Sequence, residues 1–583
     1  MALPPSNIQP MFGDSGPLSE RQRVEDLLEQ MRNERQSWVP VWQDLADYVQ
    51  PMRGKFVVQD NHRGNRRNQR IFDNTATIAA RTLDAGMMSG ITNPARPWFR
   101  LGLLDPEMTE RDDVKQWLHQ VQERMLTVIG RSNAYKSLQE AYGDLGIFGT
   151  AAIMIEAHPE QIIRCETFPV GSYFLGTDSS HRVNVFAREF QLSVAQLVEM
   201  FPDAQYSQSV RGLIRSKKWR EQISIAHLIC PNAYHDGGSS RSSDKEYRSY
   251  YWEMGSSRQA EGPADSASFL RVSGYDQFPV LGLRWEASAG EVYGTNCPGM
   301  TALGDIRELQ LIRKRLMQAI EKMVSPPMQA PAAMRNQRMT FAANDVNFVP
   351  VAGQPVQPLY TVNVNLDHLR QEQEQIRQRI NTAFFADLFL MLAYDDRAQR
   401  ATATEIAERR EEKLLALGPV LERLNDDGLN PFIDRVFALM SEQGFFPEPP
   451  EVLEGMELKV EYISVMAQAQ KVMGVGGMER FVSTTANLAG VMPDVLDSVN
   501  IDRWANRYGD MLGLDPDIIN SPEEIAAIRG ARAEAQQAQA QAEQASMQAD
   551  AVAKLGNTPA SEDSLLSEML ARGNAGVPSP GVV

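Results

Sequence analysis

At residues 303–327 the chain reads LGDIRELQLIRKRLMQAIEKMVSPP, a helical pattern that ends at two prolines. Asp305 and Glu308 have the spacing of a capping box at a helix start. Apolar residues recur at steps of three and four and form one stripe: Leu309, Ile312, Leu316, Ile320 and Met323. Because successive prolines remove backbone donors, the helix is predicted to end at residues 325–327.

The chain returns in a second helical pattern, NLDHLRQEQEQIRQRINTA at residues 365–383. We expect the two helices to cover 303–325 and 364–392. The polar faces of the second helix leave only a narrow apolar seam, which suits packing against a neighbouring copy of the chain. Packing between subunits is predicted for seven positions: Leu309, Ile312, Leu316, Ile320, Leu369, Ile376 and Ile380. An ordinary helical hairpin within a globular domain is the alternative, and periodicity alone favours it.

Residues 326–363 separate the two helices and are too many for a packing loop. They contain six prolines: Pro326, Pro327, Pro331, Pro350, Pro355 and Pro358. We therefore expect a small subdomain that projects from the hairpin.

The remaining chain alternates between helical and strand patterns. A loose arm is expected over 1–17, followed by helices at 18–49, 71–91, 111–129 and 134–148. Strands with a short helix at 194–201 follow up to Trp285, so residues 18–302 form a mixed helix and strand region. A break at 393–401 precedes a long helix and one strand over 402–465, with kinks at Gly418–Pro419 and Asn430–Pro431. Helices are expected over 466–555 and disorder over 556–583. The fold class is α+β, mainly helical.

Composition limits the function. The chain has 583 residues and a formal charge of −17, so its surface as a whole should not grip nucleic acid. Its three cysteines have no paired spacing and fit a reducing compartment. We find neither an 18-residue apolar run nor a signal peptide pattern, and expect no membrane contact.

Motifs for catalysis and for cofactor or metal binding are not found, and we expect neither an enzyme nor a cofactor. The pairs Asp395–Asp396 and Asp426–Asp427 could attract a metal, yet neither belongs to a set with ligand spacing. The cluster HRGNRRNQR at 62–70 is either a contact for phosphate or an acidic partner, or a solvated loop.

Four groups of short phrases resemble the head-to-tail connecting (portal) proteins of short-tailed bacteriophages. They are RIFDNTA at 70–76 with AGMMSG and PWF up to residue 99; FPV at 278–280 with EVYG and ALGDI up to 306; VSPP at 324–327; and TATEI at 402–406 with LGPV and GFFP up to 447. Their order covers roughly residues 20–465.

The resemblance implies a ring-shaped channel, in family members a dodecamer, at one vertex of the capsid. The hairpin helices would be the stem, residues 326–363 the clip, 18–302 the wing and 466–555 the crown. The break at 393–401 would face the channel, where Asp395, Asp396, Arg397 and Arg400 would meet the DNA. Residues 303–393 carry ten basic and eight acidic side chains, so most of the acidity lies elsewhere. We hypothesise a mostly repulsive passage with local cationic points at Arg397 and Arg400.

The resemblance also implies partners. Double-stranded DNA would pass through the ring without sequence specificity. The packaging ATPase (terminase) and later the tail adaptor or nozzle proteins would dock on the proline-bearing clip, and the capsid and scaffolding proteins would surround the ring. The protein would be made in the host cytoplasm and end at the head-tail junction of the virion. A non-ring coiled-coil scaffold is the alternative, and a nuclease using Asp395 and Asp396 is a further one.

Overall fold

The computed structural model describes residues 20–58, 70–105, 108, 111–233, 235, 241–255, 269–329, 357–358, 366–393, 417–453, 458–463, 481–482, 484–485, 504 and 522–556. The chain divides into two compact units, 1–478 and 479–583. The arm at 1–17, the channel-facing break, most of the expected crown and the tail after 556 lie outside the described residues. In the second unit, the helix expected from Ser521 onward is present as α17 (Pro522–Gly556).

The N-terminal part of the first unit is helical. Its helices are α1 (Glu20–Gln36), α2 (Val39–Val49), α3 (Thr75–Gly90), α5 (Asp112–Arg131) and α6 (Ala134–Phe148). The single helix expected over 18–49 is wrong, because Pro40 stands in the first turn of α2, where its missing N–H is tolerated. By contrast, α6 has the predicted ends. Gly149 follows it with φ of +78°, a left-handed conformation that glycine adopts without strain.

Two antiparallel sheets follow. The smaller one has the order β3-β2-β9 and is formed by β2 (Thr150–His158), β3 (Ile162–Phe168) and β9 (Val280–Arg284). The larger one is a sequential meander of β4 (Tyr173–Thr177), β5 (Val183–Ser193), β6 (Gln222–Pro231), β7 (Tyr247–Glu253) and β8 (Arg271–Tyr275). Two short helices, α7 (Val194–Met200) and α8 (Gln208–Arg215), lie between β5 and β6 in sequence.

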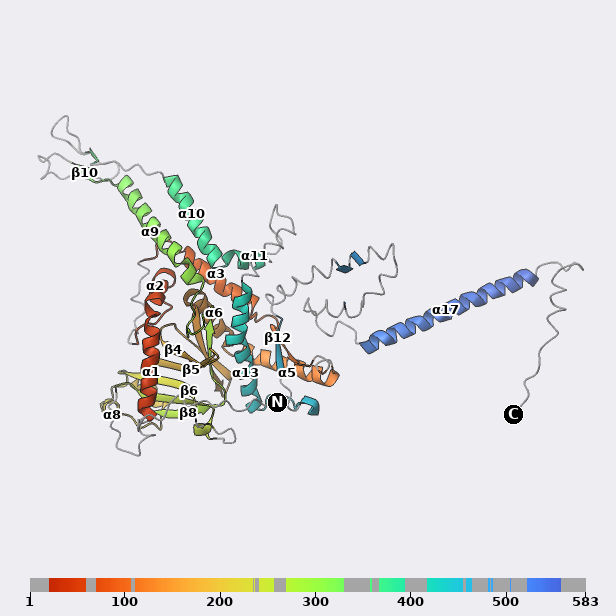
Figure 1. Cartoon of the computed structure of the whole chain (residues 1–583), viewed down its shortest axis with the longest axis horizontal. Helices are drawn as coiled ribbons and strands as arrows, with labels where there is room; N and C mark the ends of the chain where they lie inside the picture. The colour runs from red at the N-terminus through yellow and green to blue at the C-terminus, as the bar shows by residue number, and fades with distance from the viewer. Residues whose placement is uncertain are drawn as a thin grey trace, which may run out of the picture. The chain divides into compact units, whose positions relative to one another are not determined.

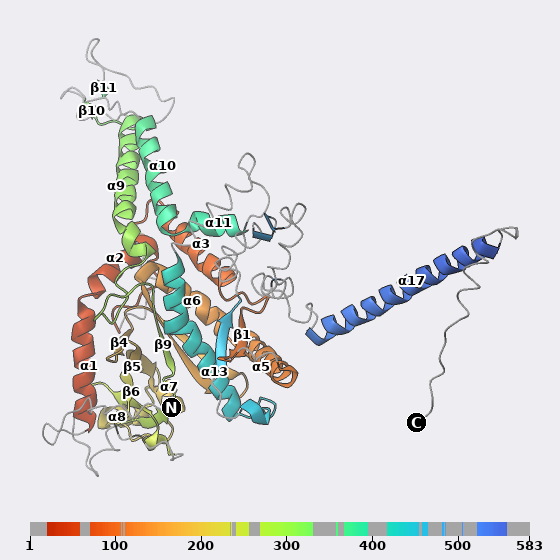
Figure 2. The same ribbon diagram turned by 45° about the vertical axis from the view of Figure 1, so that its right-hand side comes forward.

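The two helices of the hairpin lie side by side in Figures 1 and 2 and extend away from the sheets. They are α9 (Pro298–Val324) and α10 (Leu366–Ala383). At their far end β10 (Met328–Gln329) pairs with β11 (Gln357–Pro358), so the two ends of the long excursion meet. At the near end, α11 (Ala386–Ala393) follows α10.

The chain after residue 416 returns to the body of the unit. A helical segment from residue 417 passes through a π-helical turn (Asn425–Leu429) into α13 (Asn430–Glu442). The strand β12 (Leu458–Tyr462) then pairs with β1 (Phe99–Leu103), a strand that was not predicted from the sequence. Trp98 and Phe99 at this pairing are fully buried.

Three apolar cores hold the unit together. The largest joins α2, α3, α5, α6, the smaller sheet and the base of the hairpin. A second lies between α1 and one face of the larger sheet, and a third lies between the other face and α7 with α8. Figure 1 shows α8 at the end of the unit that lies away from the hairpin tip.

Candidate functional site: the α9–α10 hairpin and its anchors

The first helix of the hairpin begins earlier than predicted. Cys297 is its cap, because the Cys297 sulfur accepts a hydrogen bond of 3.4 Å from the Met300 amide, and Pro298 occupies the first turn. The next residue, Gly299, passes so close to the backbone of Ile147 that a Cβ there would clash. The capping box expected at Asp305 and Glu308 is therefore wrong, since both lie inside the helix.

Asp305 instead joins the two helices. Its carboxylate lies 2.8 Å from a guanidinium nitrogen of Arg379 on α10, and Glu308 lies 3.7 Å from the same group. The Arg379 side chain is exposed, so solvent screens these ion pairs and they contribute little to stability.

Most apolar residues of the seam are already buried between α9 and α10 of the same chain. Leu309, Leu316, Ile376 and Ile380 are buried there, while Ile312 and Leu369 are partly buried. The packing between subunits that the sequence suggested for these residues stays a prediction. Only Ile320, at 41% exposure, offers a large free area for it.

The apolar stripe of α9 continues to the tip of the hairpin, where it is exposed. Four side chains near the tip are 40–78% exposed, and they define the tip patch: Met317, Ile320, Met323 and Val324. Three of these residues, Met317, Ile320 and Val324, lie three and four positions apart and share a helix face. The tip patch is the part of the hairpin that is best suited to a further apolar partner.

A short segment before α3 ties the hairpin to the body. The side-chain oxygen of Gln310 on α9 accepts hydrogen bonds from the Phe72 and Asp73 amides, at 2.6 and 2.8 Å. Its nitrogen donates to the Asp73 carbonyl at 2.8 Å. Arg377 on α10 lies 2.8 Å from the Asp73 carboxylate. Residues 72–73 therefore hold both helices of the hairpin at once.

The charge on Asp73 is favoured by this arrangement. Burial opposes ionisation, but hydrogen bonds from Thr75 and Arg377 outweigh it and hold the Asp73 pKa below its usual value. The phrase around Asp73 was one of those that suggested the family, and here it has a structural role.

The base of α10 ends in a sharp break that the sequence did not signal. Phe385 adopts φ of +52°, which is uncommon for an aromatic residue, and α11 starts directly after it. The α11 residue Phe389 packs onto Gly86 of α3 so closely that a Cβ at residue 86 would overlap its ring. No proline or glycine marks the break, so the return helix was predicted without interruption.

The pair Asp426–Asp427 lies in the π-helical turn. Asp427 forms a two-pronged ion pair with Arg284 of β9, and the Arg284 side chain is only 2% exposed. Gly428 in the same turn allows Leu283 to approach. The helix irregularity lies at residues 425–429, directly before the predicted kink at Asn430–Pro431. No cluster of three or more potential metal ligands is found in the part of the chain that the structure describes.

A second buried charge cluster lies beneath α3. Arg53 donates a hydrogen bond of 2.7 Å to Asp144, a fully buried carboxylate on α6. Asp84 on α3 and Arg53 both approach Gly143 of α6, and the Asp84 Oδ1 meets no donor among the described residues. Burial raises the pKa of Asp84 and of Asp144 to about 6, although Arg53 opposes this shift.

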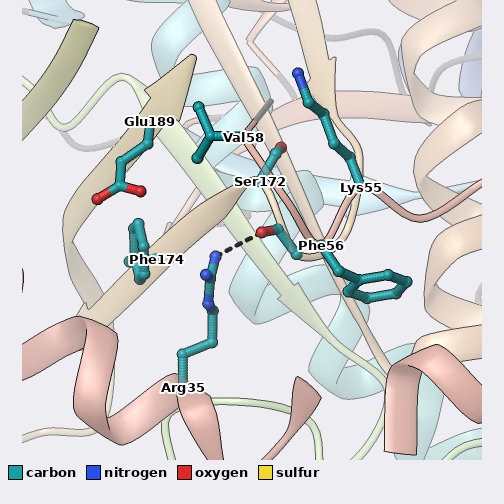
Figure 3. Close-up of a pocket in the computed structure, with 8 residues that line it drawn as sticks. Arg35, Lys55, Phe56, Val58, Ser172, Phe174 and Glu189 are labelled. Carbon is teal, nitrogen blue, oxygen red and sulfur yellow. Dashed lines mark hydrogen bonds between the residues drawn. The ribbon is translucent and has the colours of Figure 1, made fainter. Parts of the chain in front are cut away.

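The described cavities do not suggest a small-molecule site. One is a water-sized space of about 10 Å³ beside Arg35 and Gly171. Figure 3 shows Arg35 reaching toward the backbone there, and its nitrogen donates to the Gly171 carbonyl at 2.6 Å. The other is an open groove of about 510 Å³ at the base of the hairpin, lined by Asp305, Arg379 and neighbouring polar residues.

Several predicted site residues lie outside the described part of the chain. They are Pro331, Pro350 and Pro355 of the excursion and Asp395, Asp396, Arg397 and Arg400 of the channel-facing break. Of the remaining prolines, Pro327 is exposed, Pro326 is partly exposed, and Pro358 belongs to β11.

Three of the phrases that suggested a family, RIFDNTA, ALGDI and VSPP, therefore lie in the hairpin and in the segment that anchors it, whereas TATEI lies outside the described residues. The chain belongs to the bacteriophage head to tail connecting protein family, whose pattern it matches over residues 21–519. It is 41% identical to the portal protein of Salmonella phage epsilon15, over 94% of this chain and 98% of that protein. It is 40% identical to the probable portal protein of Bordetella phage BPP-1, again over 94% and 98%.

A more distant match is to a chain in a structure of the virion of a native gene transfer agent particle. The TM-score is 0.32 and the identity 11%, over 76% of this chain and 91% of that chain. Among the described residues, no helix is both long and apolar enough to span a bilayer.

Proposed function

We propose that this chain is a portal protein, which assembles into a ring at the head-tail junction of a phage and forms the channel for viral DNA. The observation that carries the proposal is the 41% identity to a portal protein over nearly the full length of both chains. The match to the connecting-protein family over residues 21–519 supports it. The non-ring scaffold and the nuclease are not favoured by these similarities.

The hairpin is the proposed stem of the ring, and the residues beyond its tip are the proposed clip. Its two helices are closed by their own seam and clamped at the base by Asp73, Gln310 and Arg377. A stem built in this way is stiff within each subunit. The exposed tip patch would then pack against the stem of the next copy, because an apolar surface on a projecting hairpin is stabilised by a partner.

The proposed function is structural, without catalysis by this chain. Energy for DNA entry would come from a separate packaging ATPase that docks on the clip, and tail adaptor proteins would use that end later. The protein would be made in the host cytoplasm and remain in the virion. Within the channel, residues 395–400 are the proposed DNA-facing loop, where Arg397 and Arg400 offer local cationic points.

Electron microscopy of the purified chain, after its mass has been measured in solution, tests the proposal. We expect rings, in this family of twelve copies, with an axial opening at least about 20 Å wide, as the diameter of a DNA duplex requires. If only monomers form, the assay is repeated with the capsid and scaffolding proteins of the same phage as nuclei for assembly. A compact oligomer with no axial opening, or no ring under either condition, would refute the proposal.

A further inference from the structure

The segment from α8 to β6 carries the densest group of free cations in the described chain. Between residues 211 and 220 lie five basic side chains and no acidic one: Arg211, Arg215, Lys217, Lys218 and Arg220. All five are exposed, and no ion pair joins any of them to another residue that the structure describes. Together with Trp219 they define the α8 basic surface.

The helix α8 is amphipathic, and packing of its apolar side leaves its cations exposed to solvent. Val210 is buried, and Ile214 packs against the third apolar core, so this face of the helix is held on the larger sheet. Arg211 and Arg215 are four residues apart and therefore share one exposed side of the helix, about 100° around from Val210 and Ile214. The helix is fixed at its start by Ser207, whose hydroxyl accepts from the Val210 amide.

Trp219 stands among these cations with 43% of its surface exposed, which is unusual for so large an apolar side chain. Its backbone is not loose. The Trp219 carbonyl accepts a hydrogen bond from the Ala195 amide at 3.2 Å, and the Glu221 carbonyl accepts one from Val194 at 3.0 Å. Both donors belong to the first turn of α7. These two hydrogen bonds hold the backbone on either side of Trp219 in place, and its side chain therefore has a fixed point of attachment.

The turn between α8 and Trp219 also has a fixed shape. Lys217 adopts a left-handed conformation with φ of +54°, and the amides of Lys217 and Lys218 donate to the last turn of α8. A glycine usually occupies such a position because a side chain there is strained. Here a lysine stands in its place, which adds one more cation beside the indole.

We propose that the α8 basic surface binds the phosphate backbone of a nucleic acid, with Trp219 stacking on a base or packing on a sugar. A run of unpaired cations matches the closely repeated charge of a polynucleotide. The core of a protein interface, in contrast, is depleted in lysine, and two lysines lie in this group. A cationic surface that surrounds an exposed aromatic ring is the usual form of a site that tracks single strands.

This surface lies far from the proposed stem tip within the same unit (Figures 1 and 2). It is therefore a contact separate from the stem tip. The inference does not rest on the portal function, since the test below measures binding by the purified chain and needs no ring.

The test is fluorescence anisotropy with a labelled 30-base-pair duplex and a labelled 30-nucleotide single strand, over a series of salt concentrations. The test variant replaces Arg215, Lys218 and Arg220 by Gln. A matched control replaces three other exposed cations by Gln: Arg131, Lys136 and Arg164. Both variants lose three positive charges, and neither touches a buried side chain.

The wild-type chain and the control variant are expected to bind with similar Kd, and the test variant at least tenfold more weakly. The slope of log K against log salt should become shallower by about 2 to 3, because three phosphate contacts are removed. Trp219→Ala should weaken binding of the single strand about fivefold or more, with Trp219→Phe retaining most of it. If stacking on bases is the contact, duplex binding should change much less.

Three outcomes would overturn the inference. One is a wild-type chain that binds neither probe at low salt. Another is an equal loss of affinity in the test and control variants, which would reduce the effect to overall charge. The third is competition by polyglutamate as effective as that by unlabelled DNA, which would assign the surface to an acidic protein.

Discussion

The guanidinium of Arg284 on β9 donates two hydrogen bonds, each 3.0 Å long, to the carboxylate of Asp427 in the π-helical turn. A third bond, from the same guanidinium to the His181 carbonyl, measures 2.9 Å. One buried arginine on β9 thus joins the loop that contains His181 to the π-helical turn before α13.

Asp427→Asn leaves that arginine buried without its counter-charge. Loss of one partner from a buried ion pair costs about 3 to 5 kcal/mol, so we expect a clear fall in the urea midpoint and melting temperature. The control is Lys459→Gln, which breaks the exposed pair with Glu461 and should change stability by less than about 0.5 kcal/mol. Equal effects of the two substitutions would show that the Arg284 pair does not stabilise the turn.

Gln310→Ala removes the acceptor for the Phe72 and Asp73 amides and the donor to the Asp73 carbonyl. We expect a loss of about 2 to 3 kcal/mol, since buried backbone groups lose their partners. Hydrogen exchange at the amides of residues 72 and 73 should become faster, while exchange in the larger sheet is unchanged. Gln318→Ala, at an exposed position of the same helix, should alter neither quantity. Unchanged protection in Gln310→Ala would contradict the proposed anchor.

Asp84→Asn tests the cluster around Arg53 through its dependence on pH. The folded-state pKa of about 6 lies above the reference of 3.8, so the folded chain holds more protons between these values. Stability from this carboxyl is therefore present at low pH and is lost as the pH rises from about 4 to 6.

Asparagine cannot ionise, so the variant should gain about 1 kcal/mol at pH 7.5 and clearly less at pH 4.5. The gain is smaller than the full pKa shift would give, because Asp84 keeps some contact with solvent. Melting temperatures at both pH values measure it. The control Asp26→Asn changes an exposed carboxylate on α1 and should show no such difference. A gain that is equal at the two pH values would rule out titration of Asp84 as its source.

Gly86→Ala tests the contact between α3 and α11. The added methyl group would overlap the ring of Phe389, and overpacking of this kind costs about 1 to 3 kcal/mol. Gly304→Ala is the control, because nothing lies near that position of α9 and alanine favours the helix by up to about 1 kcal/mol. Thermal melting should thus move in opposite directions. A stabilised Gly86→Ala variant would mean that Phe389 turns away at no cost.

The double variant Ile320→Gln with Val324→Gln tests the tip patch as an interface between subunits. Both side chains are exposed in the single chain, so the fold should persist while the fraction of rings seen by electron microscopy falls. Leu311→Gln is the control. It is also exposed, but nine residues before Ile320 it lies on the opposite side of α9. Rings lost in the control and kept in the double variant would place the interface on that opposite side.

Much of this architecture could be predicted from the sequence, and the element boundaries that were predicted wrongly have physical reasons. The C-terminal end of α6 follows from a glycine at the left-handed position, and most strands follow from their apolar pattern. The start of α9 was placed too late because a cysteine is not an expected cap, whereas Asp305 and Glu308 matched the usual spacing. The break at Phe385 depends on tertiary packing of α11 on α3, which local sequence does not encode.

The candidate site was only partly predictable for a related reason. Periodicity identified the seam residues correctly as apolar, yet it could not tell a partner helix in the same chain from one in another copy. The anchor at residues 72–73 pairs side chains more than 230 positions apart, as in Gln310 with Phe72. No pattern within one segment carries such information. The prolines and charged residues of the excursion and of the channel-facing break stay predictions.

The thiol that caps α9 has a practical consequence. Cys165, Cys230 and Cys297 are all buried, and burial raises the pKa of each thiol to about 12. Because the thiolate is the reactive form, maleimide reagents should leave the folded native chain unmodified. A single cysteine introduced at an exposed site, such as Met317 or Arg315, would then be the one labelled position in each subunit. Spin labels or fluorophores placed there could report distances between neighbouring copies without first removing any native residue.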